Sequence, residues 1–287
     1  MADISASLVK ELRDKTGAGM ADCKKALVEA NGDMNTAIEV LRKRGAASAA
    51  KRADKTANEG VIIALIGDDK KAAAIIEVNC ETDFVARNAE FDAFVNNVAQ
   101  ALLANNIDTQ DELYKIAIGN DTVEGVYNEI LAKFSEKIEI KRFETWTSDG
   151  SIASYIHAGN KLGVLIEVNA PNLNDESFAM LRDIAMQIAA MNPQFIYRAD
   201  VNTTTLEKEI EIYKQQAIDA GKKAEIADKI AQGRLEKFFT ENCLVEQTFV
   251  KDSTITISDV LKKISAIHGS DVKIIKFSRY ALGESQS

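Results

Sequence analysis

Residues 76–91, IEVNCETDFVARNAEF, contain the junction that decides the fold, because an apolar strand ends there and a helix begins. The run 72–78 is short, apolar and rich in β-branched residues, which is typical of a sheet strand. After the junction, apolar residues recur at the spacing of one helix face: Phe91, Phe94, Val95, Val98 and Leu102. We therefore expect an exposed turn between a buried strand and a core-facing helix.

This turn carries candidate binding residues. Thr82 can cap the following backbone N–H groups, and Asp83 would lie in the first helical turn, where the helix dipole favours an anion. Phe84 lies beside them, and a carboxylate with an uncovered aromatic ring suits contact with another protein. The alternative is that Asp83 only caps the helix and Phe84 only staples its start onto the core. The residues of the turn leave both interpretations open.

Composition indicates an ordinary globular chain with room for two or three small domains: 287 residues, 46% hydrophobic and 28% charged. The formal charge of -9 argues against a nucleic-acid partner, which needs a basic face. A local basic run does exist, namely Arg42, Lys43, Arg44, Lys51, Arg52 and Lys55. We interpret it as a solvated face that complements a helix dipole.

The three cysteines, Cys23, Cys80 and Cys243, are far apart and outside any CxxC spacing, so neither a disulfide framework nor a zinc site is indicated. The N-terminal stretch MADISASLVKELRDK lacks an apolar signal core, and no window approaches a membrane-spanning run. We expect a cytoplasmic protein with no membrane partner.

Residues 1–55 predict three short helices. Their apolar faces consist of Leu8, Val9 and Leu12, then Cys23, Ala26, Leu27 and Ala30, then Ala37, Ile38 and Leu41. Asn31-Gly32 should end the second helix in the left-handed region, and Asp33 should cap the third. So small a bundle should offer a face to another molecule. Met20, in the loop TGAGM, is the candidate exposed tip; the alternative is a gap-filling core methionine.

An internal duplication follows the bundle. Gly60-Val61-Ile62 aligns with Gly150-Ser151-Ile152, and IIEVN at 75–79 aligns with LIEVN at 165–169, both 90 residues apart. Each copy predicts a hairpin, helices and a closing strand, so the fold class is α+β, with two related subdomains of three-stranded antiparallel sheet plus helices. At the turn the first copy has CETDF and the second has APNLN, so the scaffold is kept while the tip differs. This difference supports a binding role for the tip as much as the capping-and-stapling alternative, and both stay open.

The second copy also contains an inserted segment. Leu206, Ile210, Tyr213, Ala217 and Ala220 step by 4 and 3, which is a heptad seam. We expect an antiparallel coiled-coil hairpin that buries its own seam poorly and supports self-association. The predicted domains are 1–55 (bundle and linker), 56–147 (first subdomain), 148–196 with 238–287 (second subdomain) and 197–237 (hairpin).

Sequence signatures of catalysis are missing. There is no GxxxxGK[ST] phosphate loop, no GxGxxG after a strand and no GxSxG, and the histidines His157 and His268 show no metal or triad spacing. We expect no enzymatic activity, no cofactor and no metal site. An acyl or phosphoryl transferase fails for want of a nucleophile with a base.

Three blocks together resemble the bacterial elongation factor Ts family: SLVKELRDKTGAGMADCKKALVEANGDMNTAIEVLRKRG, EVNCETDFVARNAEF and SYIHAGNKLGVL. Their order and spacing cover nearly the whole chain. The resemblance implies a guanine-nucleotide exchange factor that binds elongation factor Tu, a translational GTPase, in its GDP-bound and nucleotide-free states. It also implies a ubiquitin-associated-like N-terminal bundle, a two-part core and a coiled-coil hairpin.

The resemblance also implies roles for individual residues. Asp83 and Phe84, in one block with Thr82 and Val85, match the segment that enters the partner's G domain near its Mg²⁺ and phosphate site. Other matched contact positions are Arg13, Met20 and Lys24 toward the G domain, and His157 and Val250 toward the partner's far domain. Lys251 departs from the pattern, since some relatives have an apolar contact residue there. A ubiquitin-associated-type peptide-binding scaffold is the alternative, and it would leave the tip unused.

Overall fold

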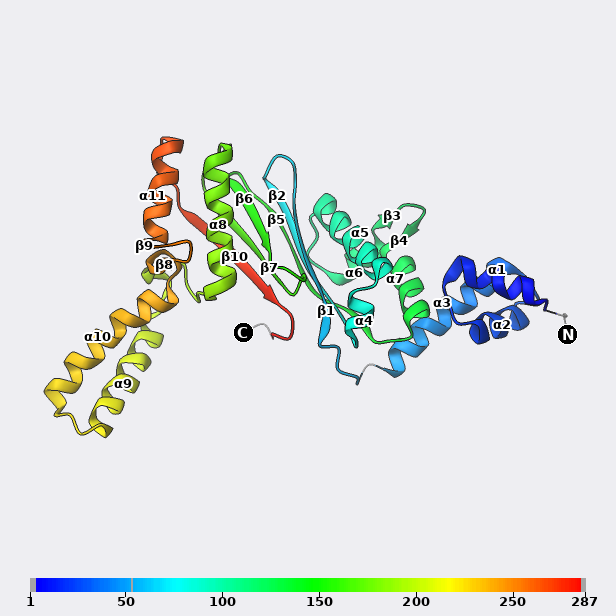
Figure 1. Ribbon diagram of the computed structural model, residues 1–287, viewed down its shortest axis with the longest axis horizontal. Helices are drawn as coiled ribbons and strands as arrows, with labels where there is room; N and C mark the ends of the chain where they lie inside the picture. Colours follow the sequence, from blue (N-terminus) through cyan, green and yellow to red (C-terminus); the bar gives the residue numbers. More distant parts are fainter. Residues whose placement is uncertain (1–3, 53, 285–287) are drawn as a thin grey trace. The chain divides into compact units, whose positions relative to one another are not determined.

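The computed structural model describes residues 4–52 and 54–284, and within them helices combine with antiparallel strands in an α+β fold (Figure 1). Two units emerge from its packing. Unit 1 comprises Met1–Thr147, Ile156–Gly163 and Tyr280–Ser287, and unit 2 comprises Ser148–Tyr155 and Val164–Arg279. Of the helices in this described part of the chain, none is long and apolar enough to cross a membrane.

The N-terminal helices are α1 (Ala6–Thr16), α2 (Met20–Glu29) and α3 (Met34–Lys51). The predicted turn before α3 is confirmed: Asn31 and Gly32 have positive φ, at 51° and 86°, and Asp33 Oδ1 accepts a hydrogen bond from Thr36 N at 2.7 Å. The predicted apolar faces form one core cluster, in which Leu8 and Ile38 are only partly buried.

Helix α3 lies against α7 (Val123–Phe134) of the same unit. A Cβ added at Gly45 would lie 2.6 Å from Ala132 N, so only glycine permits this backbone approach. Beside it, Arg42 forms ion pairs with Asp121, at 2.9 Å, and with Glu129. The interpretation of the basic run as a solvated face is therefore wrong in part, because folding brings carboxylates from other segments to its arginines.

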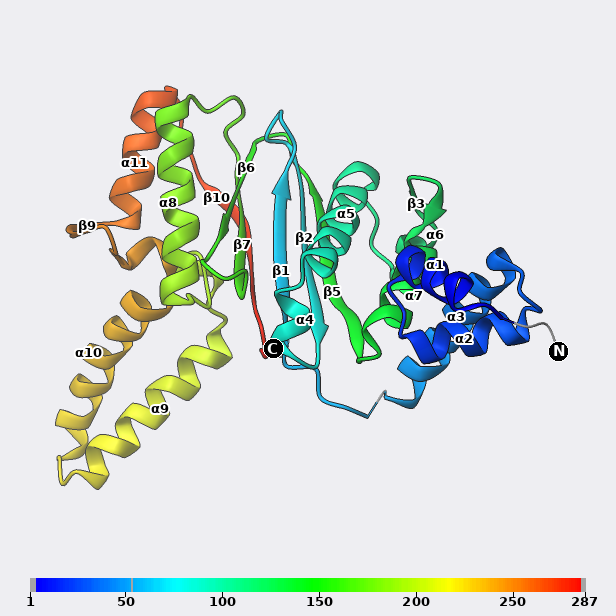
Figure 2. The same cartoon turned by 45° about the vertical axis from the view of Figure 1, so that its right-hand side comes forward.

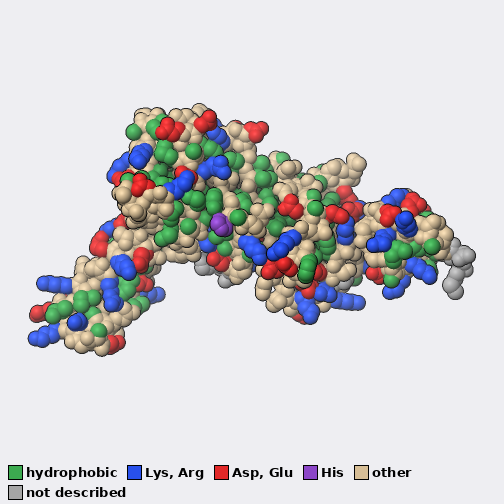
Figure 3. Space-filling view, viewed as in Figure 1, with side chains coloured by type: hydrophobic (Ala, Val, Ile, Leu, Met, Phe, Trp, Pro, Cys, Tyr) green, Lys and Arg blue, Asp and Glu red, His purple; other side chains and the backbone are tan. Residues whose placement is uncertain are grey.

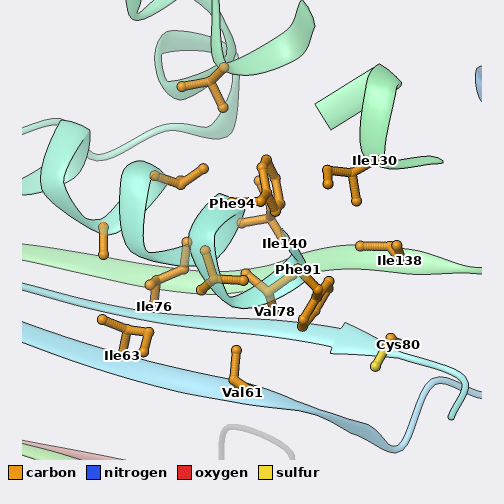
Figure 4. Close-up of a cluster of buried hydrophobic side chains, with 14 of the residues drawn as sticks. Val61, Ile63, Ile76, Val78, Cys80, Phe91, Phe94, Ile130, Ile138 and Ile140 are labelled. Atoms are coloured by element: carbon orange, nitrogen blue, oxygen red, sulfur yellow. The ribbon is translucent and has the colours of Figure 1, made fainter. Parts of the chain in front are cut away.

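The first sheet has the order β1-β2-β5, with β1 (Glu59–Ile66), β2 (Ala72–Cys80) and β5 (Ile138–Thr147) antiparallel. Helix α5 (Ala89–Asn105) packs on one face and supplies all five predicted apolar residues to the core. Figure 4 shows Phe91 and Phe94 of α5 beside Ile76 and Val78 of the sheet. Helix α6 (Gln110–Lys115) and the ribbon β3 (Ala117–Ile118) with β4 (Asp121–Thr122) complete this layer.

The opposite face of β2 holds a buried charge. Glu77 is fully buried and pairs with Arg142 at 2.6 Å and Lys141 at 3.2 Å. The Arg142 guanidinium also lies 4.1 Å from the ring centroid of Tyr280, whose hydroxyl donates to Glu144 at 3.1 Å. A buried carboxylate is tolerated here because two cations neutralise it.

The second sheet has the order β10-β7-β6, with β6 (Ser151–Ile156), β7 (Leu162–Val168) and β10 (Ile274–Ala281). Unit 2 also contains α8 (Asp175–Met191), η1 (Arg198–Asp200), α9 (Thr203–Asp219), α10 (Ala224–Asn242), η2 (Leu244–Glu246), β8 (Thr248–Phe249), β9 (Asp252–Thr256) and α11 (Ile257–His268).

Local features repeat between the two predicted copies. Helices α7 and α11 each have 12 residues, each follows a two-stranded ribbon, and each is capped by a threonine, Thr122 or Thr256. A Cβ at Gly60 would overlap the carbonyl oxygen of Val78, and one at Gly150 would overlap that of Val168. The same close backbone approach thus recurs at the 90-residue spacing, which supports the predicted duplication.

Helices α9 and α10 lie side by side as a hairpin (Figures 1 and 2). Its contact face includes buried Ala217, Ala227 and Ala231. The prediction that Ala220 belongs to the seam is wrong. Ala220 is the exposed C-cap of α9, and the chain turns at the next residue, Gly221, with φ 79°. The hairpin leaves Ile212, Ile218 and Ile226 exposed.

Candidate partner-binding site

The turn after β2 forms the four-residue helix α4 (Asp83–Ala86). Thr82 is its N-cap, as predicted, and its hydroxyl accepts a hydrogen bond from Val85 N at 3.4 Å. Val85 is 6% exposed and packs into the core between the first sheet and α5, whereas Phe84 is 84% exposed. Val85 therefore anchors this helix on the core, and Phe84 projects into solvent.

Asp83 is accessible beside Phe84. Its side chain is 44% exposed and pairs with Arg87 Nη2 at 3.4 Å, one turn later. Helix α4 ends there, and the separate helix α5 begins with Asn88 as its N-cap. Asn88 Oδ1 accepts a hydrogen bond from Glu90 N at 2.8 Å. We define the Asp83–Phe84 tip as these two residues, held on a short helix separate from α5.

Three residues that the sequence did not reveal lie next to the tip. Arg52, just after α3, donates two hydrogen bonds of 2.6 Å to the carboxylate of Glu81. Glu136, between α7 and β5, accepts from the hydroxyl of Thr82 at 2.7 Å and from its backbone N at 3.1 Å. The bond from Arg52, followed by one from the amide of Lys137, lowers the pKa of Glu81 to about 2.

Met20 and Lys24 share a surface groove on the N-terminal helices. Met20, at the start of α2, is 44% exposed, which excludes the core-methionine alternative. A groove of about 330 Å³ is lined by Ile4, Ala6, Val9, Met20, Ala21 and Lys24. Arg13 is exposed on α1 and does not line this groove. An apolar floor with a lysine at its edge suits a protein surface of mixed apolar and acidic character.

The remaining two predicted residues lie in exposed turns. His157 follows β6, in unit 1, and its backbone N donates to Leu162 O at 2.9 Å across the turn. Val250 lies between β8 and β9 in unit 2 and is 45% exposed. The buried Gln187 accepts from Val250 N at 2.8 Å, and so fixes that turn. The neighbouring Lys251 pairs with Asp183 at 2.7 Å.

Within residues 4–52 and 54–284, no three His, Cys, Asp or Glu side chains are grouped so as to hold a metal ion. The cysteines are buried and free, and burial raises the pKa of Cys80 to about 12. Figure 3 shows lysine and arginine interspersed with aspartate and glutamate on the visible face.

Comparison with known proteins gives the family. A family model described as Elongation factor TS matches residues 81–284. Elongation factor Ts of Chlorobaculum tepidum is 48% identical over 288 residues, which cover 99% of this chain and 100% of the relative. Elongation factor Ts of Clostridium perfringens is 45% identical over 283 residues, which cover 98% of this chain and 93% of the relative. The chain belongs to the elongation factor Ts family.

The candidate residues divide by how this family match covers them. The Asp83–Phe84 tip, His157 and Val250 fall within the segment that the Elongation factor TS model matches. Arg13, Met20 and Lys24 precede that segment, and the similarity to the two elongation factor Ts proteins extends over nearly the whole chain. The chain is accordingly a translation elongation factor by family.

Proposed function

We propose that this chain is a guanine-nucleotide exchange factor that binds elongation factor Tu in its GDP-bound and nucleotide-free states and promotes the release of GDP. The observation that carries the proposal is the 84% exposure of Phe84, on a helix fixed by its Thr82 cap and by the buried Val85, in a chain of the elongation factor Ts family. Among the exposed large hydrophobic side chains in the described part of the chain, Phe84 stands apart, since the next is Ile275 at 52%. The alternative, a ubiquitin-associated-type peptide-binding scaffold, assigns no role to the Phe84 ring.

The proposed mechanism is thermodynamic linkage. A factor that binds the nucleotide-free GTPase more tightly than the GDP-bound form must weaken GDP binding by the same coupling free energy. Phe84 and the Asp83 carboxylate, inserted near the Mg²⁺ and phosphate site of the partner, would supply the differential contact. No bond is made or broken by this chain, so the activity is not enzymatic and needs no cofactor of its own.

Each surface has a proposed role in this mechanism. The Asp83–Phe84 tip disturbs the nucleotide site, while Thr82 and the buried Val85 hold it in place. The proposed contacts to the G domain are Arg13, Met20 and Lys24, and those to the far domain are His157 and Val250. Because the proposed partner acts in translation, we propose a cytoplasmic location for this chain.

The domain architecture is proposed on the same basis. We infer that the N-terminal bundle is of the ubiquitin-associated type and that the two subdomains arose by duplication, as the paired glycines at 60 and 150 support. We also propose that the chain divides at residues 55, 147, 196 and 237. Exposed Ile212, Ile218 and Ile226 support self-association through the α9–α10 hairpin.

The test is stimulated release of a fluorescent GDP from purified elongation factor Tu, followed by stopped flow. A substoichiometric amount of this chain should accelerate release, since an exchange factor leaves the complex once nucleotide rebinds. Release that stays at the spontaneous rate at every concentration of the chain would refute the proposed function. Capture of many unrelated peptides in place of one GTPase would favour the scaffold alternative.

A further inference from the structure

The neighbourhood of the tip contains charged residues that come from three distant parts of the chain. Arg52 follows α3, Glu81 ends β2, and Glu136 lies between α7 and β5. Arg52 Nε and Nη2 each donate to one oxygen of Glu81, both at 2.6 Å, which is the bidentate geometry that gives the strongest ion pairs. Lys137 N donates to the same carboxylate at 2.6 Å. Glu81 is thereby fixed from two sides.

Glu136 fixes the next residue, Thr82, in a similar way. The Thr82 hydroxyl donates its single proton to Glu136 Oε1 at 2.7 Å, and Thr82 N donates to Oε2 at 3.1 Å. Since that proton is committed to Glu136, the hydroxyl can only accept from the amide of Val85, as it does at 3.4 Å. Glu136 therefore orients the cap of α4, although it belongs to another element.

Helix α4 needs such support. It has four residues, and a helix that short is not stable on its own, because nucleation is costly. Residues 81, 82 and 85 are each held by a hydrogen bond or by burial, while Phe84 between them is exposed. A recognition element that is rigid before binding loses less conformational entropy when it binds.

We propose that Arg52 and Glu136 are positioning residues for nucleotide release: they hold Glu81 and Thr82 so that the Asp83–Phe84 tip is ordered before it meets the GTPase. This inference rests on the proposed exchange function. It also gives the end of the N-terminal helical segment a role in release beyond contact with the partner, because Arg52 directly follows α3.

The test uses Arg52→Lys and Glu136→Gln, each with a matched control in the same chain. Arg52→Lys keeps the charge and removes the bidentate geometry. Its control is Arg198→Lys, because Arg198 makes a two-bond contact of 2.8 and 3.2 Å with Glu236 in unit 2. The control for Glu136→Gln is Glu112→Gln. Like Thr82 with Glu136, Thr109 donates its hydroxyl proton to Glu112, at 2.7 Å, and the same hydroxyl caps α6 by accepting a hydrogen bond of 3.4 Å.

The first measurement needs no partner. Amide hydrogen exchange at residues 85–88 of the chain alone should be faster in Arg52→Lys and Glu136→Gln than in the wild type, and unchanged in the two controls. The second measurement is GDP release over a range of chain concentrations. The maximal rate should fall by about fivefold or more, while the half-maximal concentration moves by less than about twofold, because the other contact surfaces are intact.

A double variant separates positioning from a general loss of structure. If Arg52 acts through the tip, Arg52→Lys should lower the release rate of Phe84→Ala no further, since coupled residues are non-additive. Additive losses, a variant that matches the wild type in release, or unchanged amide exchange would each overturn the inference. A wild type that fails to stimulate release would remove the proposed function, and this inference with it. A stimulating wild type with fully active variants overturns the inference alone.

Discussion

Phe84 and Val85 are neighbours in the chain and have opposite environments, at 84% and 6% exposure. Successive side chains on a helix are rotated by about 100°, so one short turn can bury one residue and expose the next. The sequence TDFV contains two apolar residues, and either of them could anchor the start of the helix on the core. Which of them packs into the core depends on the direction in which the chain leaves β2, and tertiary structure sets that direction.

The Asp83 carboxylate can be tested without disturbing the fold. Asp83→Asn keeps the size of the side chain, and the exposed pair with Arg87 contributes only about 0.3–0.5 kcal/mol, so the free energy of unfolding should hardly change. Stimulated GDP release should decrease if the carboxylate contacts the partner. Arg87→Gln is the control, because it breaks the same ion pair and leaves the carboxylate. Equal losses in both variants would assign the effect to the pair.

Glu81 predicts a pH dependence of stability. Its pKa falls from 4.5 to about 2 on folding, first because Arg52 donates to it. A carboxyl group with a lowered folded-state pKa stabilises the protein above its unfolded pKa, and that stability disappears as the pH falls from 4.5 toward about 2. The effect is modest, because Arg52 is partly exposed.

The variant Glu81→Gln should therefore lose less stability than the wild type over the same acid range. Urea unfolding at about pH 6 and about pH 3 measures the difference, since the free energy of unfolding is obtained at each pH. If the stability of the two proteins depended on pH in the same way, Arg52 would not lower the pKa of Glu81.

At the scale of elements, the α9–α10 hairpin is fastened at its base. The Tyr197 hydroxyl accepts from Ile274 N at 3.0 Å and donates to Ile274 O at 3.3 Å. Val201, Phe239 and Cys243 form a small core at the same end. A deletion at the predicted limits, residues 197–237, would remove Tyr197 and Val201 from this base.

A shorter deletion should spare both fold and release. Replacement of residues 210–230 by a short glycine linker keeps the base core, so the remainder should melt at close to the temperature of the wild type. GDP release should stay near the wild-type rate, because the tip lies in another unit. Loss of release as large as that caused by removing the tip would show that the hairpin holds the GTPase.

Prediction from sequence succeeded where a local period reports burial. The face of α5 and the caps at Asp33 and Thr82 followed from spacing and residue type alone. It failed where partners are distant in the chain: Arg52 and Glu81 are 29 residues apart, and Thr82 and Glu136 are 54 apart. Nothing local marks such pairs, because the fold alone brings them together.

For the whole molecule, the proposed duplication predicts matched effects at two equivalent glycines. Gly60→Ala and Gly150→Ala each push a Cβ into a strand carbonyl, of Val78 or Val168. Each should lower the free energy of unfolding by about 1–3 kcal/mol, as overpacking does. Gly233→Ala is the control, since a Cβ there meets nothing within 4 Å. Urea unfolding measures all three, and a harmless change at only one of the paired sites would argue against equivalent roles.

We expect Phe84 to act on the partner and to contribute little to this chain's own stability. Phe84→Ala should change the free energy of unfolding by no more than about 0.5 kcal/mol, as for an exposed side chain. Phe91→Ala, the same substitution at a fully buried site, should cost about 3–5 kcal/mol and calibrates the comparison.

The decisive measurement is stopped-flow release of fluorescent GDP from elongation factor Tu by Phe84→Ala, alongside its thermal melting curve. We expect a melting temperature close to that of the wild type and a release rate lower by at least about tenfold, equivalent to about 1.4 kcal/mol. A variant that melts normally and releases GDP as fast as the wild type would show that the Phe84 ring has no part in release.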